Sequence, residues 1–182
     1  IIVTSPTTKK EFEAITQKPI SVITNGYDVE YVDKKPMDEK FSIAHIGSLL
    51  SERNPRVLWK ALRELIKEHS SFKDDFELKL IGKVSQEILD NLHEFKLSNH
   101  LNILGYVSHD EALIEQRKSQ VLLLIEIDSY QTMGIIPGKL FEYMAAERPI
   151  LAIGPEGADY AQIIKETNTG KCFLYDEKDL IK

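Results

Sequence analysis

The sequence predicts an α/β protein in which helices cover both faces of a parallel sheet, a Rossmann-like three-layer αβα sandwich. From residue 41 onwards, short apolar runs alternate with amphipathic stretches, as expected when strands and crossover helices follow one another. The predicted strands are short apolar runs, and 121–125 is continuously apolar, which is typical of strands buried on both faces. Several of them end directly at a glycine (Gly47, Gly82 and Gly105), where the backbone can turn tightly.

The first forty residues are less regular than the rest. The predicted elements, in chain order, are a strand within 1–5, a helix over 9–15, a strand within 20–23 and a linker over 27–40. Thr8 is expected to cap the helix. The dipeptide Asn25-Gly26 indicates a turn, and the polar, charged residues after it favour a surface connection.

Beyond this linker, strands and helices alternate strictly. The predicted strands cover 41–46, 76–81, 101–104, 121–125, 150–153 and 170–174. The predicted helices cover 55–70, the residues after Ser85, 109–118, the residues after Gly138 up to Pro149, and 158–167. Pro55 suits a first helical position, and apolar residues spaced by three and four give its helix an inward-facing stripe. Ser85 and Ser108 are expected to cap the helices that follow them.

The composition is that of a soluble globular domain, with or without a flanking piece. Of 182 residues, 42% are hydrophobic and 29% are charged, so a sizeable core is expected. The net charge of −6 argues against a nucleic-acid binder, and a single cysteine, Cys172, excludes a disulfide framework. No apolar run approaches the roughly 20 residues that cross a bilayer. Because the chain opens in mid-pattern without a start methionine, we expect a fragment of a longer protein.

The stretch 134–153 has the features of an anion-binding loop and helix. A helix that opens after Gly138 directs free backbone N–H groups and the positive end of its dipole at the loop. Lys139 adds a cation in the first turn, and Glu142 follows three residues later, where a carboxylate can accept hydrogen bonds from sugar hydroxyls. The alternative is an ordinary loop–helix–strand unit in which Lys139 and Glu142 are solvated surface charges.

A separate argument leads to the same stretch. Open parallel sheets bind ligands beyond the carboxyl ends of the strands, where the strand order reverses. For the common order 3-2-1-4-5-6, counted from residue 41, the crevice lies between the loops 47–54 and 126–138. The first loop supplies Ser48 and Arg53, which suit phosphate oxygens, although Arg53 could equally be a solvated loop charge. This convergence favours an anion site.

Other kinds of site lack support in the sequence. The residues after the first regular strand do not form G-x-G-x-x-G, and no phosphate-binding loop of the G-x-x-x-x-G-K-[ST] type occurs. No His and Cys residues are paired at metal-ligand spacings. His45 lies inside a predicted strand and is interpreted as a core histidine. No Ser–His or Cys–His combination has the context of a nucleophilic site.

An ordered series of motifs resembles the GT-B glycosyltransferases, in particular the retaining, group-1, family-4-like enzymes that use nucleotide sugars. The motifs are Val22-Ile23-Thr24-Asn25-Gly26-Tyr27-Asp28, Ile46-Gly47-Ser48-Leu49, Leu80-Ile81-Gly82, Ile103-Leu104-Gly105-Tyr106-Val107, Gly138-Lys139-Leu140-Phe141-Glu142-Tyr143 and Arg148-Pro149-Ile150. The resemblance covers nearly the whole chain. It implies that 41–182 form the C-terminal, donor-binding half of a GT-B fold, and that 1–40 are a remnant of the N-terminal domain with the interdomain linker.

The resemblance also implies roles for individual residues. Glu142 matches the second glutamate of an E-x7-E motif, which holds the ribose hydroxyls of the donor, whereas Gly134 stands where the sugar-contacting first glutamate is expected. The diphosphate-binding Arg and Lys correspond to Ser48 and Arg53, and Lys139 could replace the lost charge. Arg53 and Lys139 are therefore the expected catalytic residues. The residues expected to bind the donor are Gly47, Ser48, Gly105, Tyr106, Val107, Gly134, Gly138, Leu140 and Glu142.

The function implied is transfer of a sugar from a nucleoside-diphosphate sugar to an acceptor, with retention, in polysaccharide biosynthesis. No metal and no cofactor other than the donor substrate is expected, and nucleic acid is not an expected partner. The acceptor would bind to an N-terminal domain that is missing here, so the isolated chain should be inactive. The protein is expected to be cytoplasmic, and any association with the inner face of the membrane would come through the missing domain.

Two alternatives remain. One is a nucleotide-binding module of GT-B-like fold that has lost transfer activity, because Gly134 and Ser48 stand at two expected functional positions. The other is a dinucleotide-dependent oxidoreductase, which the missing G-x-G-x-x-G disfavours.

Overall fold

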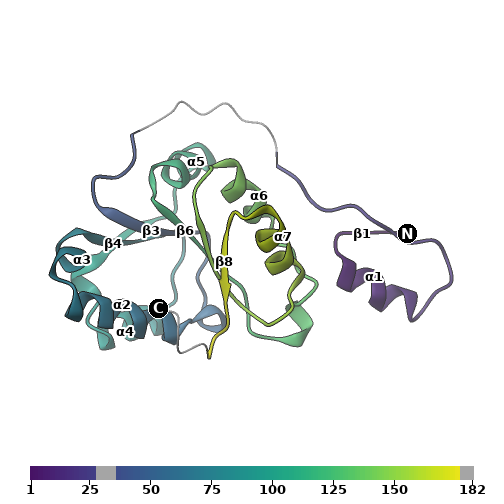
Figure 1. Ribbon diagram of the computed structural model, residues 1–182, viewed down its shortest axis with the longest axis horizontal. Helices are drawn as coiled ribbons and strands as arrows, with labels where there is room; N and C mark the ends of the chain where they lie inside the picture. Colours follow the sequence, from purple (N-terminus) through teal and green to yellow (C-terminus); the bar gives the residue numbers. More distant parts are fainter. Residues whose placement is uncertain (28–35, 177–182) are drawn as a thin grey trace.

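The computed structural model describes residues 1–27 and 36–176. Its main body is a six-stranded, all-parallel sheet with the strand order β5-β4-β3-β6-β7-β8 (Figure 1). The strands are β3 (Phe41–Ile46), β4 (Phe76–Ile81), β5 (Leu101–Gly105), β6 (Val121–Ile125), β7 (Ile150–Ile153) and β8 (Gly170–Phe173). Renumbered from β3, this is the predicted order 3-2-1-4-5-6, so the fold class and the reversal point between β3 and β6 are confirmed.

Helices cover both faces of this sheet (Figure 1). They are α2 (Arg56–Glu68), α3 (Ser70–Asp75), α4 (Gln86–Glu94), α5 (His109–Lys118), α6 (Gly138–Ala145) and α7 (Asp159–Thr167), with short 3-10 turns η1 (Ser51–Arg53), η2 (Ser98–His100) and η3 (Tyr130–Thr132). Alternate strand residues point to opposite faces, so Ile43 packs with α2 and α4 while Ala44 packs with α6 and α7. The sheet thus separates two apolar cores. Among the described residues, no helix is both long enough and apolar enough to cross a membrane.

Several predicted helix starts were wrong. The first helix, α1 (Pro6–Glu13), begins earlier than expected, because the side chain of Ser5 accepts the N–H of Thr8 and Pro6 suits the first turn. Pro55 is the N-cap of α2, so that helix starts one residue late. The start of α4 after Ser85 is as predicted, but the Ser85 side chain makes no capping bond, and its hydroxyl accepts a hydrogen bond from Ser51 at 3.2 Å.

Other boundaries also differ from the prediction. The helix expected over 55–70 ends at Glu68, because His69 is extended, with φ −125° and ψ 103°. The short α3 follows, and Phe72 there stacks on Phe76 at the start of β4, with ring centroids 4.8 Å apart. The last helix begins at Asp159 instead of residue 158. Ser108 does cap α5, through a full capping box with Glu111.

The first 27 residues form a separate small unit. Two short parallel strands, β1 (Ile2–Val3) and β2 (Ser21–Val22), are joined by α1 and lie to one side of the main body (Figure 1). Of the predicted linker over 27–40, residues 28–35 lie outside the described part of the chain.

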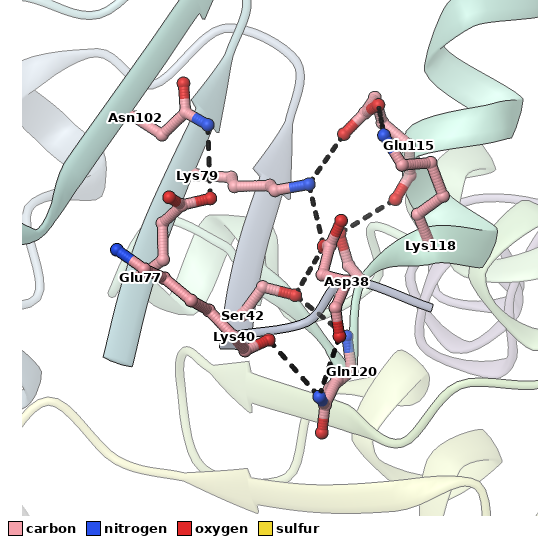
Figure 2. A network of polar contacts seen from close by, with 10 residues as sticks. Asp38, Lys40, Ser42, Glu77, Lys79, Asn102, Glu115, Lys118 and Gln120 are labelled. Atoms are coloured by element: carbon pink, nitrogen blue, oxygen red, sulfur yellow. Dashed lines mark hydrogen bonds and ion pairs between the residues drawn. The ribbon is translucent and has the colours of Figure 1, made fainter. Parts of the chain in front are cut away.

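The chain then enters β3 through a buried polar network (Figure 2). Lys79 on β4 is 4% exposed, and its ammonium lies 2.7 Å from Asp38 and 2.8 Å from Glu115. The hydroxyl of Ser42 donates to Asp38 at 2.7 Å, and the amide side chain of Gln120 donates to the Asp38 carbonyl at 3.3 Å. These contacts attach residues 38–42 to the α5 side of the sheet.

Candidate functional site

The carboxyl ends of the central strands lie close together at one edge of the sheet. The N–H of Gly47, directly after β3, donates to Ile81 O at 2.8 Å. The N–H of Gly82, directly after β4, donates to Gly105 O at 2.6 Å. A Cβ on Gly82 would stand 2.6 Å from Gly47 O, and Gly82 has φ +118°, so a side chain is excluded there. The strand ends can approach because these residues are glycines.

An ion pair joins the two loops at the reversal point. The Arg53 guanidinium donates to Glu126 Oε1 through Nε at 3.2 Å and Nη2 at 2.8 Å. The same oxygen accepts the Ile127 N–H at 2.9 Å, and the Tyr175 hydroxyl donates to the Glu126 carbonyl at 2.9 Å. Glu126 is only 3% exposed, so Arg53 is held by a buried carboxylate.

Lys139 reaches the same place from α6. Its ammonium lies 2.7 Å from the position that a Cβ on Gly47 would occupy, directly over the end of β3. Burial and the neighbouring charge of Arg53 lower the Lys139 pKa, while Glu126 and Glu142 oppose that change. Within residues 1–27 and 36–176, no hydrogen bond or ion pair to this ammonium is found. The reversal point between β3 and β6 therefore carries a partly desolvated cation that an anion could neutralise.

The N-terminus of α6 opens beside this cation. Pro137 is the N-cap residue and supplies no side-chain capping bond, and Gly138, the first helical residue, is exposed. Leu140 is fully buried, and its N–H donates to Pro137 O at 3.0 Å. The Leu140 side chain is thus part of the core, while the helix opening at Gly138 and Lys139 can receive an anion.

Glu142 stands one turn further along α6, where a second helix holds it. The Gln116 side chain on α5 donates to Glu142 Oε2 at 3.0 Å. Gln116 is 1% exposed, and its own carbonyl oxygen has no partner in the described part of the chain. Gln116 is therefore fixed by packing, and Glu142 keeps its other oxygen for further hydrogen bonds.

The buried histidine of β3 lies below the two cations. His45 is fully buried, and Nδ1 donates to the Leu123 carbonyl at 3.0 Å, which confirms the core interpretation. Burial, with the charges of Lys139 and Arg53, lowers the His45 pKa to about 3. The imidazole is therefore neutral and adds no third positive charge beneath the crevice.

The remaining predicted residues lie around this centre at different places. Ser48 is exposed on the loop after β3. Gly105, Tyr106 and Val107 close β5 at the outer edge of the sheet, and the Tyr106 side chain is 94% exposed. Gly134 faces α1, and a Cβ on it would stand 2.9 Å from Thr8 Oγ1. The described residues contain no group of three or more His, Cys, Asp or Glu side chains that could hold a metal ion.

Sequence reasoning missed two residues of this centre. Glu126 follows a buried apolar strand directly, at the loop already assigned to the crevice, and a carboxylate at that place was the available signal. Gln116 carried no such signal, because its partner lies 26 residues away on another helix.

A comparison with protein families decides what this chain is. Residues 40–182 match the family model of the glycosyl transferases group 1. The chain belongs to this family. The predicted resemblance to GT-B glycosyltransferases is thereby confirmed. No curated protein matches the chain.

Solved structures share the fold of this group 1 glycosyltransferase chain. WaaG, a glycosyltransferase involved in lipopolysaccharide biosynthesis, superposes with a TM-score of 0.73 at 13% identity, over 99% of this chain and 50% of WaaG. HepE from Anabaena, solved with UDP, gives a TM-score of 0.72 at 14% identity, over 97% of this chain and 50% of HepE. The chain thus spans half the length of each of these two proteins.

One similar structure is itself a single domain. The C-terminal domain of a glycosyl transferase group 1 family protein, LpcC from Francisella tularensis, gives a TM-score of 0.58 at 16% identity. The match covers 80% of this group 1 chain and 72% of the LpcC chain.

Proposed function

We propose that residues 41–182 form the donor-binding domain of a retaining glycosyltransferase that takes a sugar from a nucleoside diphosphate. The observation that carries this proposal is the convergence of Arg53, Lys139 and the uncapped start of α6 on the crevice between β3 and β6. Two cations and a helix N-terminus suit a diphosphate. The solved complexes of HepE with UDP, and with UDP and glucose, support the same class of ligand.

In the proposed reaction the protein stabilises the departing diphosphate. Negative charge grows on the leaving group as the bond to the sugar breaks, and the sugar acquires oxocarbenium character. Arg53, Lys139 and the α6 dipole are already in place, so they stabilise this charge without reorganising. The buried Glu126 keeps the Arg53 guanidinium at the end of β6. Glu142, oriented by Gln116, binds the ribose hydroxyls and takes no part in bond breaking.

The proposal extends to the protein around this domain. Residues 1–40 would belong to the N-terminal, acceptor-binding lobe and its linker, and the rest of that lobe would lie in a longer chain. The half-length coverage of WaaG and HepE supports this division. We place the protein in the cytoplasm, acting in polysaccharide biosynthesis, and at the inner face of the membrane only through that lobe. The lipopolysaccharide role of WaaG supports the pathway class.

Calorimetry tests the donor site directly. The chain is titrated with UDP, GDP, ADP and CDP sugars, and one base is expected to bind best. Glu142→Gln should weaken that binding by about 10- to 150-fold, because charge-assisted hydrogen bonds are worth roughly 1.5–3 kcal/mol. With a nucleotide that lacks the ribose hydroxyls, Glu142→Gln and the parent protein should bind with nearly the same affinity.

Glu147→Gln is the matched control, since Glu147 is exposed just beyond the end of α6. Unchanged affinity in Glu142→Gln, or an equal loss in both variants, would show that Glu142 does not bind the ribose.

A second candidate is a donor-binding module without transfer activity. The surroundings of Gly134 support this candidate. Thr8 Oγ1 lies 2.9 Å from the position of a Cβ on residue 134, so a glutamate that contacts the sugar would not fit there. A protein that includes the acceptor lobe would then bind the nucleotide sugar without hydrolysing or transferring it. Turnover with an authentic acceptor by that longer protein would exclude this candidate. Such turnover by the 182-residue chain alone would contradict the expectation that the chain is inactive by itself.

A further inference from the structure

The small N-terminal unit touches the donor domain through the start of α1. The backbone N–H of Thr7 donates to Asp159 Oδ2 at 2.9 Å, and the Thr7 hydroxyl donates to Asp159 Oδ1 at 3.0 Å. Asp159 lies in the first turn of α7, and its own N–H donates to the Met133 carbonyl at 2.9 Å. One carboxylate therefore accepts two hydrogen bonds from a residue 152 positions away, at the positive end of the α1 dipole.

The same end of α1 lies against Gly134. A Cβ on Gly134 would stand 2.9 Å from Thr8 Oγ1, 3.2 Å from Ser5 Oγ and 3.4 Å from Thr7 Cβ. Ser5 is fully buried, although the rest of its small unit is largely exposed. A side chain at position 134 would therefore push α1 away from the donor domain.

We propose that this surface, made of Asp159, Met133 and Gly134, is the docking site by which the donor domain holds the N-terminal lobe in a closed arrangement. The partner is the α1 N-terminus, which supplies Ser5, Thr7 and Thr8. This inference rests on one part of the proposed function, namely that residues 1–40 belong to the lobe opposite the donor domain. It gives position 134 a physical role: glycine is needed there because α1 fills the space.

The docking site is connected to the crevice through one loop. Met133 and Gly134 belong to the segment that starts at Glu126, the partner of Arg53, and ends where α6 opens at Gly138. The Asp159–Met133 bond holds the middle of this loop, and when α1 docks, its packing against Gly134 and the Thr7–Asp159 bonds hold it further. Closure of the lobes and the shape of the anion site are thereby coupled.

The test measures the distance between α1 and α7 in the 182-residue chain. Spin labels are placed at Lys10 and Lys165, both exposed, with Cys172 replaced by Ala, and distances are measured by double electron–electron resonance. The parent should give one narrow, short distance. Gly134→Glu and Asp159→Ala should each lengthen and broaden it, while Glu166→Ala, an exposed acid on the same helix, should leave it unchanged.

Thr7→Val removes the hydroxyl donor from the opposite partner without altering α7, so it separates loss of docking from damage to the helix. Circular dichroism establishes that each variant keeps its helices. The docking site is overturned if Gly134→Glu, Asp159→Ala and Thr7→Val all keep the parent distance. This measurement contains no nucleotide, so its failure is distinct from failure of the donor site, which calorimetry of Glu142→Gln reports.

Discussion

His45 shows how one buried residue limits the charge of the crevice. Its imidazole lies inside β3, close to Lys139 and Arg53, and a proton on it would have no solvent and two cations nearby. Because the imidazole stays neutral, the positive charge at the ends of β3 and β6 comes from Lys139 and Arg53. The consequence is a group that binds a proton in the unfolded chain but not in the folded one.

This predicts an acid-dependent loss of stability that His45 causes. The pKa is about 3 when folded and near 6.5 when unfolded, so between pH 6.5 and pH 3 the unfolded state takes up the proton and the folded state does not. The free energy of unfolding should fall as the pH drops from 6.5 towards 3, by up to about 1.4 kcal/mol per pH unit from this group. His45→Gln should flatten that slope, as measured by urea denaturation at several pH values.

The exposed His69 provides the control. His69→Gln should keep the slope of the parent protein. If His45→Gln also kept it, the folded-state pKa of His45 would not be low.

Arg53 shows the limit of prediction for a single residue. Its position and charge predicted a phosphate ligand, but its pairing with Glu126 joins residues 73 positions apart on two loops. A free guanidinium would be mobile and solvated. The buried carboxylate instead holds it at the crevice, which the residue type alone does not reveal.

At the scale of elements, the two serines at the N-cap positions of α4 and α5 can be compared directly. Ser108 makes a full capping box on α5, whereas Ser85 precedes α4 without a side-chain capping bond. Ser108→Ala should lower the free energy of unfolding by about 1 kcal/mol, because an N–H of the first turn loses its partner. Ser85→Ala should change it by less than about 0.5 kcal/mol. Thermal and urea denaturation measure both, and equal losses would show that the cap geometry does not decide the effect.

The N-terminus of α6 differs from that of α5 in its capping. A capped helix would have its first N–H groups occupied, as in α5, whereas Pro137 offers no side-chain acceptor. The helix is stabilised instead by packing of Leu140 and Tyr143 in the core. No side-chain cap therefore occupies the opening of α6, in contrast to the opening of α5.

At the scale of the molecule, the Lys79 network attaches residues 38–42 to the six-stranded sheet and α5. Burial opposes the charge of Lys79, but hydrogen bonds from its ammonium to Asp38 and Glu115 outweigh this, so its pKa is raised. Burial likewise opposes ionisation of Glu115, but hydrogen bonds from Lys118 and Lys79 lower its pKa. The Glu115 contribution to stability is therefore present above its unfolded pKa of 4.5 and is lost as the pH falls below it.

Removing Lys79, which is paired with both Asp38 and Glu115, should lower the stability of the protein strongly. Lys79→Met leaves two carboxylates without their partner, and we expect the free energy of unfolding to fall by about 3–5 kcal/mol. Lys9→Met is the control, because the Lys9–Glu13 pair is exposed and worth less than about 0.5 kcal/mol. Denaturation of both variants at neutral pH measures the difference. Similar losses in the two variants would contradict a special role for Lys79.

The sequence by itself determined the architecture. Short, mainly apolar runs located β3, β4, β6 and β7 to the residue, because strands buried on both faces need mostly apolar side chains, although β3 also carries His45 and β4 also carries Lys79. The alternation with helices then allowed few topologies, and the common one led to the two loops of the crevice. Arg53, Lys139 and Glu142 were assigned to the donor site by the same reasoning together with the family resemblance.

Only the tertiary structure decided which side chains meet. The Arg53–Glu126 pair, the support of Glu142 by Gln116, the anchoring of Asp38 by Lys79 and the approach of α1 to Gly134 all join residues distant in the chain. Local patterns follow from the repeat of a helix or a strand, whereas these contacts depend on where separate elements lie in space. Gly134 is the clearest case: read along the chain it is a missing glutamate, and in the folded protein it is the surface on which a helix rests.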